Sequence, residues 1–563
     1  MVRWGRTMLN DVQRTLILAS RGEIPADVVY ENAVVFNPFT CSWITSDFAV
    51  KSGLIAGLGD YKALRRVDLK GRRIVPGLID AHVHIESSLL IPSEYARLVS
   101  GHGTTTVIAD PHEIANVYGS EGIEYMLSAR VGLPVDIFIT LPSCVPATPL
   151  DRCGAVLNAS DLAGFVGRDG VVGLAEMMNV PGVLNLDPEV WKKLSLFPVV
   201  DGHAPLLSGK DLNAYIASGI QSDHESTSAS EAGEKLRLGM RIYIREGSTE
   251  RNLKELIKIV NPCNCSHFSF ATDDRHVDML VSSGHIDDCI RKAVEHGLEP
   301  EIAIRMGTLS PAERFSLHDR GALTPGRLAD FCVLEKTGIF RVEKVFKQGE
   351  MVENYPEKST ICGENSFRSH TIPSGLLTIQ GEGVARVIGI VPGQILTKNL
   401  EFEIEGRHIP DLERDILKVA VCSRYYDKMC GMGLVHGFGL KRGAIASSIS
   451  HDSHNIVAVG VHDEDISRAI RGIMENRGGM VAVDNQRTVL LPLECAGLMS
   501  IRPYEEVCKK MNELNARAIE YGSIHDPFMY LSFLALTVIP HLRVTERGVF
   551  DVDSFEDVPL FRE

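Results

Sequence analysis

The chain has no surplus of basic residues. Its 58 lysines and arginines are outnumbered by 73 aspartates and glutamates, which gives a formal net charge of −15 at pH 7. Proteins that bind nucleic acids or anionic membrane surfaces need a basic face. We therefore expect neither nucleic acid nor membrane as a partner.

Long apolar runs are also missing. No purely apolar run approaches the roughly 20 residues that span a bilayer. Near the N-terminus, the only apolar patch is residues 16–19, which is too short for the apolar region of a secretory signal. These absences exclude a membrane-spanning protein of the usual kind, and we expect a cytoplasmic protein.

The 12 cysteines lack the regular spacing of a disulfide framework. Because no secretory signal is present, we expect a reducing compartment and free thiols. A free cysteine behaves as a small hydrophobic residue. Most of these side chains should therefore be buried in the core.

A length of 563 residues exceeds a single hydrophobic core and predicts two or three domains. Short alternating strands are expected at residues 28–36, 43–51, 54–58 and 73–75, with turn residues between them. The same pattern returns at residues 323–334 and 342–349. Since isolated strands need partners, we expect the two groups to form one small β-sandwich.

Between these groups, apolar strand-like runs alternate with longer helical stretches over residues 76–320. Such alternation over about 245 residues is typical of a (β/α)8 TIM barrel, which needs ~250 residues and keeps its chemistry at the C-terminal ends of its strands. The fold class is therefore α/β. Residues 353–372 are expected to form a linker.

The last part of the chain, residues 373–563, is expected to be a C-terminal α+β domain. Helices are predicted at residues 466–476 and 504–521, and strands at 444–448, 455–460 and 479–484. The expected domains are therefore residues 1–75, which hold the N-terminal segment and the first half of the sandwich, 76–320 for the barrel, 321–355 for the second half of the sandwich, and 373–563.

Residues 76–86 read PGLIDAHVHIE and are the most informative stretch of the chain. Side chains two apart in a strand point the same way, so His82 and His84 share one face and are able to hold one metal ion. An isolated pair of this kind is more often structural. Here, however, an apolar strand ends at the pair, and further acidic and imidazole groups follow at later strand ends.

The 76–86 run resembles the first-strand motif of the amidohydrolase superfamily, whose members are metal-dependent hydrolases built on a (β/α)8 barrel. Later segments resemble the adenine deaminase family within it, and the likeness covers almost the whole chain after about residue 28. These segments are GTTTVIADPHEIAN at 103–116, GLAEMMN at 173–179, DGHAP at 201–205, SDHE at 222–225, ATDDRH at 271–276, GFGLKRGAIASS at 437–448 and HDSHN at 451–455. Residues 420–426, AVCSRYY, depart from the family, which usually carries Glu-Arg-His there.

The resemblance implies two divalent metal ions. Many relatives bridge their ions with a carboxylated lysine, but this chain offers Glu176 at the end of the fourth strand. One ion would be held by His82, His84, Glu176 and Asp273, and the second by His203, His224 and Glu176. Oxygen and imidazole ligands without thiolate suit manganese or iron(II), with zinc as an alternative.

Two ions would lower the pKa of a shared water and supply hydroxide, which attacks C6 of the purine. Asp273 is our candidate for the proton shuttle, with Glu176 as the other catalytic residue. In an extended strand Asp274 would point to the opposite side and support the site from behind. Candidate substrate-binding residues are Asp110, His112, Glu113, Asn116 and Glu225. Ordinary loop capping is an equally good explanation for the aspartate and asparagine among them.

The resemblance implies an enzyme of purine salvage that converts adenine to hypoxanthine and ammonia. We expect a small-molecule purine substrate and a homo-oligomer. Two alternatives stay open: an amidohydrolase that acts on another aminopurine or a cyclic amide, and a catalytically silent scaffold that binds metal and purines. The polar segment HDSHN at residues 451–455 also predicts that the C-terminal domain helps to close the active site.

Overall fold

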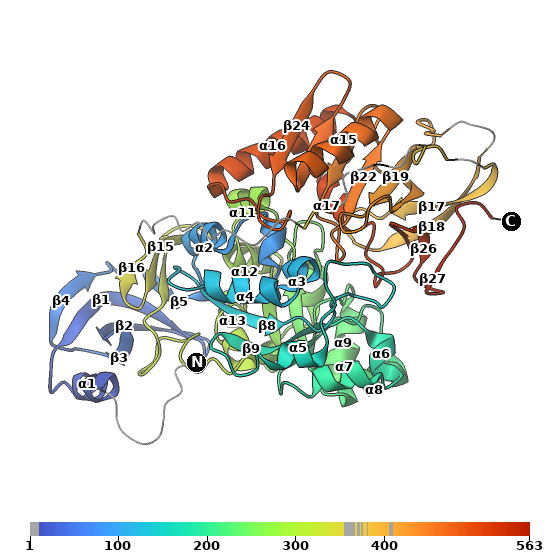
Figure 1. Cartoon of the computed structure of the whole chain (residues 1–563). Coiled ribbons are helices and arrows are strands. Elements are labelled where there is room, and N and C mark those ends of the chain that lie inside the picture. The colour runs from blue at the N-terminus through green and yellow to red at the C-terminus, as the bar shows by residue number, and fades with distance from the viewer. Residues whose placement is uncertain are drawn as a thin grey trace.

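The computed structural model describes residues 11–353, 366–368, 372, 375–379, 381–404 and 409–562. Most of the expected linker at 353–372, and the last two residues of the expected 321–355 segment, lie outside the described residues. Figure 1 shows a β-rich part on one side of a central barrel, and the C-terminal part above the barrel. Each of these three parts is built on its own β-sheet or pair of β-sheets.

The first sheet joins strands from both sides of the barrel. It contains β1 (Ala26–Asn37), β2 (Ser42–Lys51), β3 (Leu54–Leu58), β4 (Ala63–Asp68), β5 (Arg73–Pro76), β14 (Phe331–Leu334), β15 (Val342–Lys347) and β16 (Glu350–Met351). Their order is β16-β15-β14-β5-β1-β2-β3, and β4 also pairs with β1. Tyr30 stacks on Phe48 and meets Phe331 edge-on, both at 5.0 Å between ring centroids. The aromatic core therefore ties the N-terminal strands to those that follow the barrel.

The apolar patch at residues 16–19 lies in helix α1 (Asp11–Ser20). Leu16 and Ala19 are buried there and pack on apolar residues of the first sheet, among them Val29 and Ala49. The patch therefore forms part of the domain core.

The barrel consists of eight short parallel strands. They are β6 (Leu78–Val83), β7 (Thr104–Ala109), β8 (Asp136–Leu141), β9 (Val171–Met177), β10 (Val200–Gly202), β11 (Ser222–Asp223), β12 (Arg241–Arg245) and β13 (Phe268–Ala271). Every residue of β6 and β7 is buried, as in parallel strands that are covered on both faces. A bridge between Val83 and Asp273 brings the ends of the first and last strands together. The barrel predicted from the alternation is confirmed.

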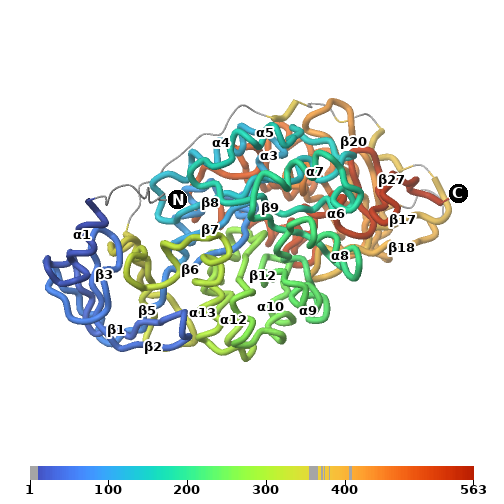
Figure 2. Tube along the Cα trace, turned by 90° about the horizontal axis from the view of Figure 1, so that it is seen from below, coloured from blue at the N-terminus to red at the C-terminus, as the bar shows by residue number. Residues whose placement is uncertain are grey.

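Helices connect the barrel strands and cover their outer faces (Figure 2). They are α2 (Pro92–Gly101), α3 (His112–Tyr118), α4 (Ser120–Ala129), α5 (Ala159–Ala163), α6 (Val180–Leu184), α7 (Pro188–Leu194), α8 (Gly209–Ala217), α9 (Ala229–Arg237), α10 (Leu253–Leu256), α11 (Val277–Ser283), α12 (Ile286–Glu295), α13 (Pro300–Met306) and α14 (Leu309–Arg314). Short 3-10 helices lie at η1 (Ile85–Ser88), η2 (Ile257–Ile259) and η3 (Cys265–His267). Among all described residues, no helix combines the length and apolarity needed to cross a membrane.

The C-terminal part is built on a second large sheet of order β18-β17-β20-β19-β22-β21-β23-β24. Its strands are β17 (Gly383–Ile390), β18 (Thr397–Ile404), β19 (Ile416–Cys422), β20 (Cys430–His436), β21 (Ala444–Ser447), β22 (Ile456–Gly460), β23 (Gly479–Val483) and β24 (Thr488–Pro492), and a small sheet of β25 (Leu542–Thr545), β26 (Gly548–Asp551) and β27 (Glu556–Asp557) adds to it. Its helices are α15 (Asp463–Asn476), α16 (Tyr504–Glu520) and α17 (Pro527–Ser532). Helix α15 packs on β21, β22 and β23.

Helix α16 docks the C-terminal part onto the barrel. It packs against α11 and α2 (Figure 1). At its start, Arg97 binds Glu505 at 2.6 Å, and the Tyr504 amide donates to Glu94 at 2.9 Å. One apolar core runs through the barrel and the C-terminal sheet. The C-terminal part is therefore fixed against the barrel through a shared core.

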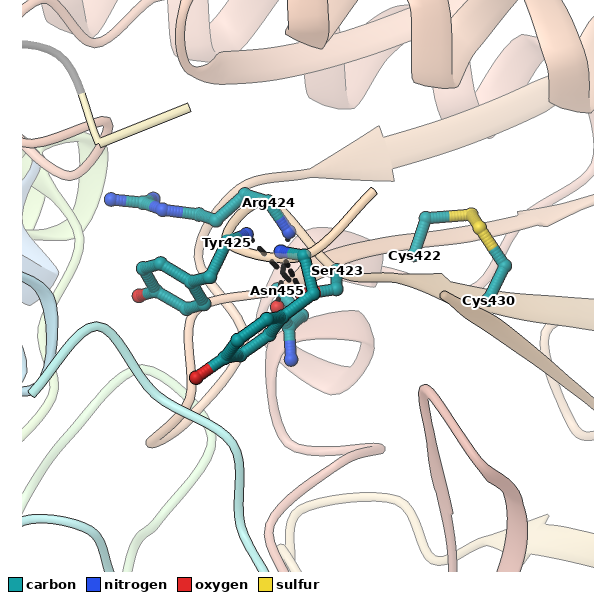
Figure 3. The surroundings of a disulfide bond; sticks show 7 residues. Cys422, Ser423, Arg424, Tyr425, Cys430 and Asn455 are labelled. Carbon is teal, nitrogen blue, oxygen red and sulfur yellow. Dashed lines mark hydrogen bonds between the residues drawn. A yellow bond between two sulfur atoms is a disulfide. The ribbon is translucent and has the colours of Figure 1, made fainter. Parts of the chain in front are cut away.

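The expectation of free thiols is wrong for Cys422, Cys430 and Cys495, which are disulfide-bonded. Cys422 and Cys430 form a disulfide (Figure 3). They are directly opposite each other on the antiparallel strands β19 and β20, and this pairing is not visible until the register of the two strands is known. The expected burial is found for Cys144, Cys153, Cys265, Cys289, Cys332 and Cys508.

Candidate metal centre

The centre begins with His82 and His84 at the end of β6. Their Nε2 atoms are 3.2 Å apart and face Asp273 Oδ1 at 3.3 and 3.2 Å. Asp273 follows β13, the neighbouring strand across the barrel closure. The first and eighth strands thus bring two imidazoles and a carboxylate to one point.

Glu176 lies between this group and a second pair of histidines. Its Oε1 is 3.4 Å from His84 Nε2 and 3.9 Å from His82 Nε2. Its Oε2 is 2.7 Å from His203 Nδ1 and 3.1 Å from His224 Nε2. Burial would raise the pKa of Glu176, but the His224 and His203 imidazoles hold it well below its ordinary value. An ionised carboxylate with one oxygen toward each histidine pair is suited to bridge two cations.

His203 and His224 come from the strand ends next to Glu176, because they directly follow β10 and β11. Asp223 supports both, since its Oδ1 accepts from the Ala204 amide at 3.0 Å. Its Oδ2 binds Lys235 Nζ at 2.9 Å inside the protein. Burial would raise the pKa of Asp223, but Lys235 holds it well below its ordinary value.

The donor set fits divalent cations. The ligand atoms of His82, His84 and Asp273 lie within 4.8 Å of one another, as do those of His82, Glu176 and His224. All five side chains are buried, and the atoms are imidazole nitrogens and carboxylate oxygens, which suit manganese, iron(II) or zinc. The geometry places the six predicted ligands in one cluster.

Asp110 orients His84, the second histidine of the first pair. Its backbone carbonyl lies 3.0 Å from His84 Nδ1, and accepting a hydrogen bond there leaves Nε2 with a free lone pair for a metal. Its carboxylate accepts from His112 at Nδ1 (3.0 Å). Asn116 donates to the His112 carbonyl at 2.9 Å. Of the five predicted substrate-binding residues, Asp110 and Asn116 thus support the segment that follows β7. The other three, His112, Glu113 and Glu225, line a cavity next to the metal cluster.

Arg245 was missed by the sequence reasoning. It ends β12, the seventh strand, and its Nη1 is 2.8 Å from Asp273 Oδ2. The same guanidinium binds both oxygens of Glu225. Burial would raise the pKa of Asp273, but Arg245 holds it well below its ordinary value. A count of the strands would have placed a basic residue at this position, because residues 241–245 read RIYIR.

The expected position of Asp274 is wrong. Asp273 has a φ of 54°, a left-handed conformation that ends the regular alternation of strand β13. Asp274 therefore also lines the cavity, where it accepts a hydrogen bond from Ser87. Burial and the neighbouring Asp273 raise the pKa of Asp274. The two aspartates share one cavity, but the pKa of Asp273 is lowered and that of Asp274 is raised.

The C-terminal domain supplies part of the cavity wall. His451, Asp452, Ile395, Phe533 and Leu536 line it together with the barrel residues. Phe533 stacks on His451 with ring centroids 4.4 Å apart. Met178 adds an apolar surface from the barrel side. The cavity thus has a polar floor at the metal cluster and an apolar wall that is mostly contributed by the C-terminal domain.

The divergent stretch at residues 420–426 contacts the 451–455 segment, and Figure 3 shows Arg424 and Tyr425 next to Asn455. The Tyr425 hydroxyl donates to the Ser453 carbonyl at 2.8 Å, and the Arg424 amide donates to Asn455 Oδ1 at 3.2 Å. Arg424 itself is buried and donates to the Ala496 carbonyl at 2.5 Å. This stretch therefore supports the cavity wall but does not line the cavity.

Two family models match this chain. The model described as the amidohydrolase family matches residues 73–352, and the model described as the adenine deaminase C-terminal domain matches residues 394–556. The curated adenine deaminases of Methanoregula boonei and Methanoculleus marisnigri are 58% and 60% identical to the chain, over 97% and 92% of its length and 98% and 100% of theirs. A protein of Carboxydothermus hydrogenoformans named adenine deaminase 2 is 45% identical over 97% of the chain and 99% of its own length.

Proposed function

Because the chain belongs to the adenine deaminase family and converts adenine to hypoxanthine and ammonia, we propose that its buried cluster holds two divalent ions and that Asp273 moves the protons of this reaction. The observation that supports the proposal is the position of Glu176, whose two oxygens face two different histidine pairs. His82, His84 and Asp273 would hold one ion with Glu176 Oε1. His203 and His224 would hold the other with Glu176 Oε2.

When bound, two divalent ions would lower the pKa of a shared water and supply hydroxide at neutral pH. Manganese, iron(II) and zinc all suit the nitrogen and oxygen donors of this chain. The reaction forms a C–O bond at C6 of adenine and breaks the bond from C6 to the amino nitrogen, which leaves as ammonia. Two proton movements accompany this exchange, one to the purine ring and one to the leaving amino group.

The contacts of Asp273 support its proposed role as the proton carrier. Its Oδ1 faces the ion site, and its Oδ2 is held by Arg245 at 2.8 Å. The Arg245 guanidinium lowers the pKa of Asp273 and so favours its ionised form, which is the form that would accept a proton from the attacking water. A weakly basic carboxylate also gives that proton up readily to a more basic purine nitrogen. Arg245 would thus fix both the orientation and the charge of the shuttle.

An ammonia-release assay on purified protein tests the proposal together with metal analysis. Adenine, adenosine, guanine and cytosine should be compared, with manganese, iron(II) or zinc restored to metal-free protein. We expect two ions per chain at saturation and ammonia from adenine only when the ions are present. Full turnover by protein that has been stripped of metal would overturn the proposed mechanism.

A further inference from the structure

The segment between β21 and β22 reaches from the C-terminal domain to the barrel and is anchored there by Glu113. His451 Nδ1 lies 2.5 Å from Glu113 Oε1, and His454 Nε2 contacts Glu113 Oε2. Burial would lower the pKa of His451, but the Glu113 carboxylate raises it to about 9. Both carboxylate oxygens are therefore used to fix the segment, and the two residues between the histidines, Asp452 and Ser453, have defined positions.

Asp452 is the first of these two residues, and one of its two carboxylate oxygens lacks a hydrogen-bond partner among the described residues. Its side chain lines the cavity and the residue is 5% exposed. Oδ1 lies 3.7 Å from His112 Nε2, whereas Oδ2 has no hydrogen-bond partner in the described part of the chain. A buried carboxylate oxygen without a donor is costly to keep. An occupant of the cavity that donates an N–H would remove this cost.

The position of Asp452 relative to the metal cluster suits one particular donor. His112 lies between the two, with its Nδ1 3.5 Å from Glu176 Oε1 and its Nε2 toward Asp452. The N–H donors of adenine are its amino group at C6 and the N–H of its five-membered ring. With C6 at the ion site, the ring N–H is the donor that remains for the free oxygen of Asp452.

The remaining walls fit a flat base without a sugar. Met178, Ile395, Phe533 and Leu536 form the apolar surfaces of the cavity. The 451–455 segment closes the side on which the five-membered ring of the base would lie, because Glu113 fixes it against the barrel. A nucleoside carries its sugar on this ring and has no N–H there. Both the hydrogen bond and the space would be lost for such a substrate.

We propose that Asp452 accepts the imidazole-ring N–H of the purine and so makes the site specific for the free base over its nucleoside. The inference rests on the proposed function, since it uses the orientation of C6 toward the ions. It assigns substrate recognition to a residue of the C-terminal domain.

The test compares adenine with 9-methyladenine, which has no N–H in its five-membered ring. Asp452→Asn and Asp452→Ala should lower kcat/KM for adenine by roughly 10- to 100-fold, as expected for a hydrogen bond to a charged group. Most of this loss should appear in KM. The slow turnover of 9-methyladenine should hardly change, because that substrate never makes the bond. The preference for adenine over 9-methyladenine should therefore fall by the same factor.

Ser453→Ala is the matched control, because it alters the same segment at a side chain that does not line the cavity. Ser453→Ala should leave kcat/KM for adenine and the slow turnover of 9-methyladenine unchanged. Equal losses for adenine and 9-methyladenine in both Asp452 variants would overturn the proposal and make Asp452 a structural residue. A fall in bound metal would also overturn it, since His112, Glu113 and Asp452 lie within 4.8 Å of one another and would then hold an ion. The proposed function itself fails separately, if the metal-loaded wild type releases no ammonia from adenine.

Discussion

At the scale of single residues, Glu176 is the side chain on which metal occupancy should depend most. Its two oxygens face His84 and His203 on opposite sides. Glu176→Gln keeps the shape and removes the charge, so we expect bound metal to fall from two ions per chain toward one or none. Elemental analysis of the purified variant gives this number directly. A variant with full occupancy and full activity would exclude the bridging role.

Asp273 should matter for turnover more than for folding. Asp273→Asn cannot relay a proton, and general acid–base groups typically contribute ~10²- to 10⁴-fold to the rate. We expect a loss of that size in kcat with at least one ion retained. Asp274→Asn is the comparison, because Asp274 lines the same cavity. If the Asp274 variant were the inactive one and the Asp273 variant nearly normal, the two roles would have to be exchanged.

Lys235 is a residue whose removal should be seen in stability. It is fully buried and binds Asp223 at 2.9 Å. Lys235→Met leaves a buried carboxylate without its partner, which typically costs about 3–5 kcal/mol. Because the pair holds the pKa of Asp223 below 3.8, its stabilisation is present above that pH and is lost as the pH falls. Denaturant unfolding should show the largest difference from wild type at neutral pH and a smaller one in acid.

Part of the centre was predictable at this scale. The shared face of His82 and His84 follows from their spacing of two in a strand, whereas the roles of the later ligands were implied by the family resemblance of their motifs. Asp274 could not be placed, because its position depends on the left-handed conformation of Asp273. The contact between Asp452 and the barrel depends on how two distant domains pack, which no local pattern contains.

At the scale of elements, the segment between β21 and β22 should fix the shape of the substrate cavity without binding metal. His451→Ala combined with His454→Ala removes both contacts to Glu113. A misplacement of about 1 Å in such a site is able to cost on the order of 10²-fold. We expect a loss of that order in kcat/KM for adenine, while metal analysis still finds the wild-type content.

His436→Ala is the matched control for this variant, because His436 ends β20 and stacks on Phe402 away from the cavity. It should leave the kinetics unchanged. Unchanged kinetics in the folded double variant would instead leave the segment with a structural role.

The elements themselves were predicted well where a single period runs through them. The helix predicted at residues 504–521 is α16 (Tyr504–Glu520). The helix predicted at 466–476 begins earlier, at Asp463, since three acidic residues favour its first turn. The pairing of the strands was harder, because the order β18-β17-β20-β19-β22-β21-β23-β24 brings neighbours together that are not adjacent in sequence. The cross-strand disulfide was missed for another reason, because the register of the consecutive strands β19 and β20 was not predicted.

At the scale of the whole molecule, the metal ligands and the domain contacts belong to one connected structure. The ligands come from the first, fourth, fifth, sixth and eighth barrel strands, so bound ions would tie together opposite sides of the barrel. The barrel and the C-terminal sheet share one apolar core, and α16 packs on α11 and α2. We therefore expect both parts to unfold in one cooperative transition.

This connection predicts how the molecule responds to loss of metal. A ligand at 100 times its dissociation constant stabilises the folded state by about 2.7 kcal/mol. Removing the ions with a chelator should lower the midpoint of thermal unfolding by at least a few degrees, and restoring manganese should reverse the shift. Because the core is continuous, calorimetry should record a single peak that moves as a whole. Two peaks, of which only one moves with the chelator, would show that the barrel and the C-terminal domain unfold independently. The contacts of Glu113 with His451 and His454 would then be too weak to couple them.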